Sequence, residues 1–236
     1  TLMEDVMYFV AILIGLSIER WTSLASQLRS YALLEKYIEV MTSWLKTRSW
    51  PVWVGLLILL LPITLAVAFF YVVFTSAFSG LLGLVFAVFV LFYCLGSFPS
   101  AAHSEGVENI VVQAHRNIFS VLFWFMVCGP AGAVLYRVNS LLVPNYSLAE
   151  LFQLILEWVP ARLEAVSYAI VSHFKSVMAC VMKYLFSGLN DNEQLLIESA
   201  AASIDANVDH VIHDTLKLID RSLLAWLTLI VIIVLF

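Results

Sequence analysis

The sequence is poor in charge and in cysteine, and it lacks the short motifs that carry most enzyme chemistry. Only 12% of its 236 residues are charged, about half the fraction of an ordinary soluble domain. The cysteines Cys94, Cys128 and Cys180 lie in apolar segments at unrelated spacings, so we expect small buried side chains rather than disulfides or a zinc site. The sequence contains no phosphate-binding loop, nucleophile elbow, Ser/His/Asp spacing or paired-cysteine motif, so nothing in the residues alone identifies a nucleophile. The net charge of −5 and the lack of a basic aromatic patch argue against a nucleic-acid partner.

The chain is, in contrast, rich in apolar residues. Hydrophobic residues make up 62% of it, and its mean hydropathy is +0.96. These values exclude a water-soluble globule and are typical of a polytopic membrane protein. No linker rich in glycine, serine and proline separates two halves. The sequence therefore predicts a single all-α membrane domain over residues 1–236, a helical bundle with kinked spans and additional amphipathic helices.

The segment 119–137 predicts a kinked transmembrane helix at the centre of this bundle. Its run from Val121 to Tyr136 carries no charge but is interrupted by Gly129, Pro130 and Gly132. Proline inside a helix removes a backbone donor and clashes one turn back. In hydrocarbon such a break persists only where neighbouring helices or a cavity satisfy the freed groups. We therefore expect the kink to lie inside the bundle, with polar neighbours directed towards it.

The other predicted elements follow from the pattern of apolar and charged residues. They are a cytoplasmic amphipathic helix over 22–48, a transmembrane hairpin over 51–97, a bent helix over 148–186, an acidic amphipathic helix over 191–220 and a C-terminal membrane helix over 222–236. Pro160 should break or bend the helix over 148–186. Its part 152–174 either crosses the bilayer, which brings the acidic helix to the cytoplasm, or lies at the surface, which leaves the acidic helix outside.

Two groups of charged and polar residues flank the predicted bends. Arg162, with Glu157 and Glu164, lies beside Pro160, and Arg137 with Asn139 closes the kinked span. Charged side chains inside a membrane segment are candidates for function, so both groups are candidate ligand- or partner-binding sites. The alternatives are an internal ion pair or cap that fixes the bend, and an interfacial anchor at Arg137.

A looser cluster precedes the kinked span. It consists of His103, Glu105, Glu108, His115 and Arg116, and it could contact a ligand or an ion. An ordinary solvated connection is the alternative.

The most metal-like pattern is Asp209-His210-Val-Ile-His213-Asp214. On a helix His210 and His213 share a face, and Asp209 is four residues from His213. Two imidazoles and a carboxylate could hold zinc, but a site needs a further ligand and outer hydrogen bonds. The alternative is the solvated face of an amphipathic helix.

Three blocks, in this order, resemble the AmpE/CobD (CbiB) family of membrane proteins over residues 18–175. They are Ile18-Glu19-Arg20; Leu122-Phe123-Trp124 with Gly129-Pro130-Ala131-Gly132-Ala133 and Leu135-Tyr136-Arg137; and Trp158-Val159-Pro160-Ala161-Arg162-Leu163.

The two branches of that family imply different functions. The CobD branch resembles an ATP-dependent synthase that joins an aminopropanol group to a corrin side chain in cobalamin synthesis, with stretches that look like ENTxDG and VNTLDSM. This chain has VQAHRN over 112–117 and VNSLLV over 138–143, so Leu142 stands where the second stretch has Asp. Amide formation through an acyl phosphate would want carboxylates to hold magnesium and offset the phosphate charge. Because those carboxylates are missing, the chain looks more like the AmpE branch, which is implicated in sensing or signalling during β-lactamase induction.

We therefore expect a multi-pass protein of the bacterial inner membrane that modulates signalling in response to peptidoglycan status and uses no cofactor. The expected partners are the lipid bilayer and a cell-wall-derived or lipid ligand or another membrane protein, and catalysis is not expected. The alternative is an amide-forming synthase of the CobD/CbiB type that uses ATP and magnesium. A transporter is the third hypothesis, because broken helices suggest one, but the hydropathy shows no inverted repeat.

Overall fold

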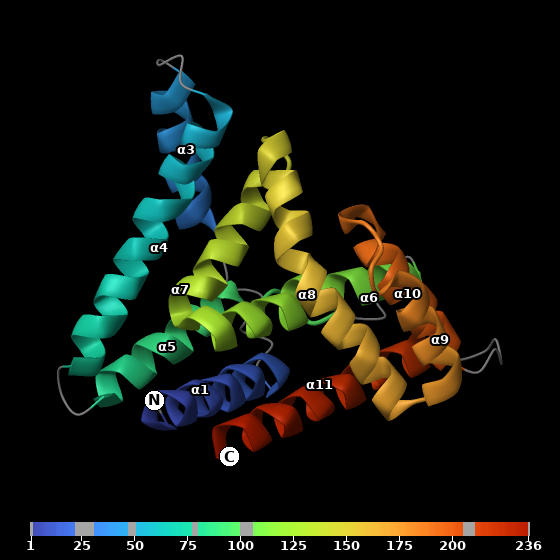
Figure 1. Cartoon of the computed structure of the whole chain (residues 1–236). Helices are drawn as coiled ribbons and strands as arrows, with labels where there is room; N and C mark the ends of the chain where they lie inside the picture. The colour runs from blue at the N-terminus through green and yellow to red at the C-terminus, as the bar shows by residue number, and fades with distance from the viewer. Residues whose placement is uncertain are drawn as a thin grey trace. The chain divides into compact units, whose positions relative to one another are not determined.

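The chain is an all-α membrane protein, as predicted (Figure 1). The computed structural model describes residues 2–21, 31–46, 51–76, 80–99, 106–204 and 211–235, and these ranges contain helices and no strand. The elements are α1 (Leu2–Trp21), α3 (Ala32–Lys46), α4 (Val52–Ser76), α5 (Leu81–Cys94), α6 (Val107–Ala114), the π-helical turn η2 (His115–Phe119), α7 (Ser120–Leu142), α8 (Ser147–Val171), α9 (Phe174–Tyr184), the 3₁₀ turn η3 (Leu189–Asp191), α10 (Asn192–Ser203) and α11 (Val211–Leu235).

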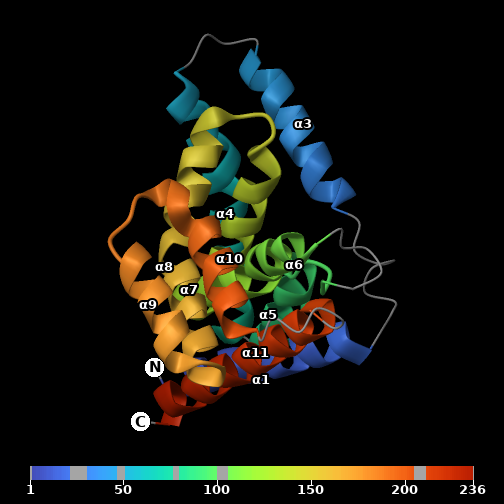
Figure 2. The ribbon, with the colours of Figure 1, turned by 90° about the vertical axis from the view of Figure 1, so that its right-hand side faces the viewer.

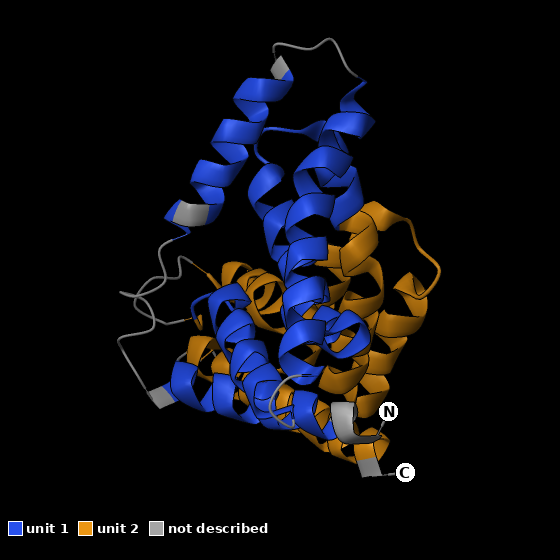
Figure 3. Ribbon diagram, turned by 90° about the vertical axis from the view of Figure 1, so that its left-hand side faces the viewer, with its two compact units in different colours: residues 1, 3–97, 121–153 blue, residues 2, 98–120, 154–236 orange. Residues whose placement is uncertain are grey.

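The helices form two compact units, coloured separately in Figure 3. Unit 1 comprises residues 1, 3–97 and 121–153, and unit 2 comprises residues 2, 98–120 and 154–236. The boundaries fall inside α7 and α8, so both helices contribute to both units. The prediction of a single membrane domain over 1–236 stays a prediction.

Two helical runs in the described ranges are long enough, apolar enough and poor enough in charge to be candidate membrane spans by composition alone. One is α4, and the other is the continuous run Val107–Leu142, which joins α6, η2 and α7. In unit 1 α4 packs against the shorter apolar helix α5. Gly83 permits this contact, because a Cβ atom there would lie only 2.3 Å from Cγ2 of Thr75.

The kink predicted within 119–137 is confirmed in α7. Gly129 has φ 64° and ψ −157°, which interrupts the helix directly before Pro130. Residues before proline avoid the helical region, and this conformation is one that essentially only glycine adopts. The space is also tight, because a Cβ atom on Gly129 would lie 2.6 Å from the Tyr8 hydroxyl oxygen. Sequence and packing therefore fix the bend at the same residue.

Several predicted boundaries differ from the structure. The predicted helix 148–186 is two helices: α8 continues through Pro160 to Val171, and α9 begins at Phe174 after His173 leaves the helical conformation. A single proline can sit inside such an apolar helix when its neighbours satisfy the freed carbonyl.

The predicted acidic helix 191–220 is also divided. The first part, α10, ends at Ser203, where Ile204 adopts an extended conformation, and residues 205–210 lie outside the described part of the chain. The second part continues without interruption into the predicted membrane helix 222–236, so both belong to α11. The amphipathic helix predicted over 22–48 is described as α3, and residues 22–30 and 47–50 lie outside the described ranges.

The cysteine prediction is wrong for two of the three residues. Cys94 is buried, but Cys128 is exposed and Cys180 is half-buried. Cys128 lies in the apolar run before the kink, where an outward-facing thiol on a membrane helix needs no polar partner.

In unit 2, helices α9 and α10 lie side by side, as Figures 1 and 2 both show. The apolar core there includes a row of small residues on α8, Ala161, Ala165 and Ala169. Small side chains at four-residue spacing allow close helix packing. This core surrounds the polar residues described next.

Candidate functional site

Unit 2 contains a fully buried chain of hydrogen bonds between η2 and α8. His115 Nδ1 lies 2.7 Å from Glu164 Oε2, and the Tyr168 hydroxyl donates to Glu164 Oε1 over 2.5 Å. On the other side of the imidazole, Ser120 Oγ lies 3.1 Å from His115 Nε2. We call these four residues the buried network; each is at most 1% exposed.

Local helix geometry aligns the buried network. Glu164 and Tyr168 are four residues apart on α8 and therefore share one face. His115 and Ser120 are five residues apart, and the wider π-helical turn over His115–Phe119 brings them onto the same side. Single π-helical turns occur frequently at functional sites.

The order of donors and acceptors defines what the buried network can do. A carboxylate at Glu164 accepts the Nδ1 proton of His115, which leaves Nε2 free to accept the Ser120 hydroxyl proton. The connectivity from hydroxyl to imidazole to carboxylate is that of a Ser-His-acid triad. Because Ser120 is completely buried, its hydroxyl cannot reach a substrate in this conformation. The arrangement can therefore hold or pass a proton but does not present a nucleophile.

Beside the buried network, Arg116 links a buried carboxylate to the surface. Its Nη2 donates to Glu193 Oε1 over 2.6 Å, and its Nε lies 3.4 Å from Glu157 Oε1. The side chains of Arg116 and Glu193 are 45% and 46% exposed, whereas Glu157 is 1% exposed. A buried carboxylate without a cation is strongly unfavourable, and Arg116 gives Glu157 a cationic partner inside unit 2.

The guanidinium of Arg162 holds α8 to the turn that joins α9 and α10. It donates to the backbone oxygens of Trp158, Tyr184, Leu185 and Ser187 and to the side-chain oxygen of Asn192, at 2.8 to 3.3 Å. The same guanidinium lies 3.9 Å from the centre of the Trp158 ring, so it also makes a cation–π contact. The carbonyls at the end of a helix have no partner within the helix. Arg162 therefore caps the C-terminal end of α9.

In unit 1 Arg137 caps the C-terminal end of α5 in the same way. Its Nε donates to the carbonyl oxygen of Cys94 over 2.6 Å, and its guanidinium lies 5.5 Å from the centre of the Tyr31 ring. Asn139 is also buried and donates to the carbonyl oxygen of Ala149 and to Gln153 Oε1, which ties the end of α7 to the start of α8. That these residues bind a ligand stays a prediction.

The remaining predicted site residues do not gather in the described structure. His103, Glu105, Asp209 and His210 lie outside the described ranges. Glu108 is exposed on α6, while His115 in the same predicted cluster is buried, and His213 is exposed on α11. Among described residues no three His, Cys, Asp or Glu side chains are placed to hold a metal ion.

A second polar group lies on the exposed surface between α9 and α10. Glu198 accepts hydrogen bonds from the Tyr184 hydroxyl, from Lys183 Nζ and from Gln194 Nε2. These donors, Tyr184 first, lower the pKa of Glu198 from 4.5 to about 2, and the hydrogen bonds to Tyr184 and Glu198 raise the pKa of Lys183.

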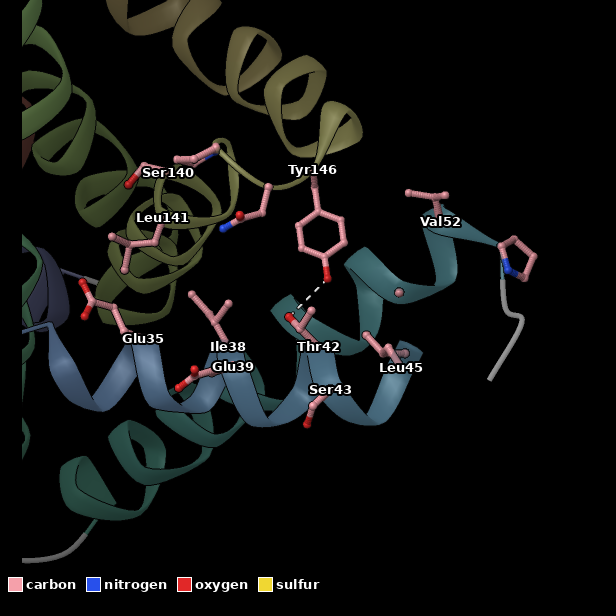
Figure 4. Close-up of a pocket in the computed structure, with 14 residues that line it drawn as sticks. Glu35, Ile38, Glu39, Thr42, Ser43, Leu45, Val52, Ser140, Leu141 and Tyr146 are labelled. Carbon is pink, nitrogen blue, oxygen red and sulfur yellow. Dashed lines mark hydrogen bonds between the residues drawn. The ribbon is translucent and has the colours of Figure 1, made fainter. Parts of the chain in front are cut away.

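Unit 1 has an open cleft of about 1040 Å³ (Figure 4). It lies between α3, the start of α4, the end of α7 and the turn before α8, and a hydrogen bond of 3.2 Å joins Tyr146 to Thr42 within it. Glu35 and Glu39 line it from adjacent turns of α3. None of the predicted site residues lines this cleft.

Sequence reasoning missed Ser120 and Tyr168 in the buried network and Glu35, Glu39 and Tyr146 in the cleft. The four-residue spacings of Glu164 with Tyr168 and of Glu35 with Glu39 were available as signals, because such pairs share a helix face. Ser120 carried no such signal, because its alignment with His115 depends on the π-helical turn.

Comparison with known proteins finds similarity to cobalamin biosynthesis proteins. The cobalamin biosynthesis protein CobD of Stutzerimonas stutzeri is 31% identical over 97 residues, which cover 34% of this chain and 32% of that protein. CobD of Chromobacterium violaceum is 31% identical over 85 residues, which cover 31% of this chain and 27% of that protein. The chain thus matches about a third of the length of these curated relatives. No family model matches the chain, and no solved structure matches it.

These similarities overturn the expectation of an AmpE-like signalling protein in β-lactamase induction. Both relatives carry the name of the other branch, CobD. The absence of carboxylates from the stretches 112–117 and 138–143 therefore does not separate this chain from the CobD branch.

Proposed function

We propose that this chain acts in cobalamin biosynthesis as a CobD-type protein of the bacterial inner membrane, which it crosses several times. The observation that carries the proposal is its similarity to two cobalamin biosynthesis proteins of different bacteria. The apolar runs of α4 and of Val107–Leu142 support a membrane location.

Two acidic residues lie beside the stretch over 112–117, although the stretch itself contains none. Helix α8 brings Glu164 to His115 and Glu157 to Arg116, so two buried carboxylates face this stretch from a segment more than 40 residues away. Acidic groups are therefore present beside the stretch, although they come from another helix.

The CobD-type synthase that the resemblance implies would use ATP and magnesium, and the described residues do not fit that pair. The oxygens of Glu164 accept from His115 and Tyr168, and Glu157 pairs with Arg116, so these carboxylates already have protein partners. No group of three metal-binding side chains occurs in the described ranges. The buried network joins α8 to the run Val107–Leu142 through hydrogen bonds, and these bonds fix how the two helices are oriented.

Growth that depends on cobalamin made by the cell tests the proposal. The full-length gene that encodes this chain is expressed in a bacterial strain whose own CobD gene is deleted, on a medium where growth requires newly made cobalamin. We expect growth to be restored by this gene and not by the empty vector, and all strains should grow when cobalamin is supplied.

Deletion of the gene in its own host provides the second measurement. We expect loss of growth under the same condition and rescue by added cobalamin. Normal cobalamin production in the deletion strain would contradict the proposed function, whatever the result in the foreign host.

A further inference from the structure

Helix α8 presents a continuous apolar stripe on its outer side. Leu151, Ile155, Val159, Leu163 and Ile170 are exposed by 53, 54, 41, 41 and 65%. Their spacing of four, four, four and seven residues keeps them within about 120° around the helix. Between Leu151 and Ile170 these are the exposed residues of α8, and all of them are apolar.

The opposite side of α8 is polar and buried. Glu157, Glu164 and Tyr168 are at most 1% exposed, and they point about 180° away from the centre of the stripe. The helix is therefore apolar on the outside and charged on the inside. This pattern is the reverse of a water-exposed surface helix and is the one expected where lipid is the solvent.

The length of the stripe matches the bilayer. Leu151 to Ile170 spans about 30 Å at 1.5 Å per residue, the thickness of the hydrocarbon core. Exposed polar residues resume just beyond both ends, at Glu150 on one side and at His173 and Lys175, which flank the exposed Phe174, on the other. Interfacial helices can have the same length, so the opposite side of α8 distinguishes the two arrangements.

At the same level, the other side of α8 borders an exposed ion pair. Glu157 lies about 3 Å from Val159 along the helix axis and contacts Arg116, whose pair with Glu193 is about half exposed. Exposure of this ion pair to lipid would be strongly unfavourable. At one depth, therefore, an apolar side chain and a charged pair are both exposed, and one solvent cannot suit both.

We propose that α8 crosses the bilayer as a wall between lipid and water. The stripe from Leu151 to Ile170 contacts lipid acyl chains, and the Arg116–Glu193 pair faces water that reaches the middle of the membrane. The buried network lies inside this wall at membrane depth. A water-soluble reactant would reach the protein there from the side of Arg116. The proposal is independent of the function in cobalamin biosynthesis.

Spin labels on the stripe test the lipid contact. Single cysteines replace Leu151, Val159 and Ile170 in a full chain whose Cys94, Cys128 and Cys180 are alanine, and collisions with oxygen and with a water-soluble nickel complex are measured in nanodiscs. Val159 should lie within about 5 Å of the bilayer centre and about 10 Å deeper than Leu151 and Ile170. Leu65, 63% exposed in the middle of α4, is the deep control, and Val40, exposed on amphipathic α3, is the shallow control.

Two results would overturn the lipid contact. Equal, shallow depths at all three positions would mean that α8 lies at the surface. Low collision rates with both reagents would mean that another protein surface covers the stripe.

Thiol modification tests the wet side. Glu193→Cys leaves the contact between Arg116 and Glu157 in place, and it should react with a charged, membrane-impermeant thiol reagent as fast as Lys175→Cys does, while Val159→Cys should not react. No reaction at residue 193 would refute the proposal that water reaches the Arg116–Glu193 pair.

Modification from each side of sealed vesicles tests the crossing. Asn145→Cys and Lys175→Cys, both at exposed positions, should be labelled from opposite sides. Labelling from the same side would refute it.

Discussion

At the scale of single residues, the buried arginines act on backbone carbonyls at helix ends. Arg137 donates to the last turn of α5, and Arg162 donates to the last turn of α9 and to the residues just after it. Helix ends carry a partial negative charge and unpaired carbonyls, which a guanidinium with five donors satisfies better than an ammonium. Arg137 belongs to the block Leu135-Tyr136-Arg137 and Arg162 to the block over residues 158–163, so these two sequence blocks contain structural residues.

Replacing Arg162 with lysine should destabilise unit 2. A lysine retains the charge but cannot reach five oxygens in a fork or stack on Trp158 in the same way. We expect a loss of about 2–4 kcal/mol in the free energy of unfolding, since buried carbonyls lose their donors. Denaturant unfolding in detergent measures it, with Lys175→Arg at an exposed position as the control. Wild-type stability of the lysine variant would refute the capping role.

The hydroxyl of Tyr168 can be tested by removing one oxygen. Tyr168→Phe leaves Glu164 Oε1 without that donor in a fully buried place, so we expect a loss of about 1–3 kcal/mol. Tyr146→Phe is the matched control, because its hydroxyl bonds Thr42 in a partly exposed cleft, where water can replace it. Equal losses in the two variants would contradict the importance of burial.

At the scale of elements, two irregular turns determine the course of the run Val107–Leu142. The π-helical turn η2 aligns His115 with Ser120, and the bend at Gly129 changes the direction of α7. The two features differ in their causes. The bend has a local cause, because Pro130 and the lack of a side chain at Gly129 favour it. The π-helical turn η2, in contrast, occurs where His115 contacts Glu164 of α8.

Gly129→Ala should be strongly destabilising for two reasons. The backbone at φ 64° and ψ −157° is strained for any side chain, and the new Cβ would approach the Tyr8 hydroxyl to 2.6 Å. The conformational strain alone is worth about 1–3 kcal/mol. Thermal unfolding in detergent should show a clear loss relative to Gly188→Ala, where a Cβ meets nothing within 4 Å. A double variant with Tyr8→Ala should recover only the steric part; full recovery would show that backbone strain is unimportant.

At the scale of the whole molecule, the chain combines lipid-type and water-type surfaces. The exposed side of α4 is apolar along its length, while α9 and α10 expose the ionised pair of Lys183 and Glu198. The free energy of unfolding in detergent therefore has a contribution from the charged surface, which depends on pH. The contribution from the apolar surface does not depend on pH.

Glu198 makes one contribution to the pH-dependent part. Its pKa falls from 4.5 to about 2 on folding, so its contribution to stability is fully present above pH 4.5 and is lost as the pH falls from 4.5 towards 2. In the variant Glu198→Gln the unfolding midpoint should therefore vary less with pH between pH 4.5 and 2. Its variation with pH near neutral pH should be unchanged. Glu108→Gln, on the exposed side of α6, is the control. An unchanged slope in the Glu198 variant would contradict the assignment.

The sequence by itself determined that the chain is a membrane protein and that its central helix bends at Gly129. Apolar content and low charge predicted an all-α membrane protein, and Gly129 with Pro130 predicted the kink, because hydrophobicity and backbone restriction are properties of a residue and its neighbours. The helix boundaries at Ser172 and Ser203 were missed, since no proline or glycine marks them.

Only the tertiary structure decided which polar groups meet. His115 and Glu164 are 49 residues apart and Arg116 and Glu193 are 77 apart, so no local pattern could pair them. For the same reason, the acidic residues beside the stretch 112–117 cannot be predicted from that stretch, because α8 supplies them. Only the packing of helices brings such distant residues together, and a buried polar group is stable where that packing gives it a partner.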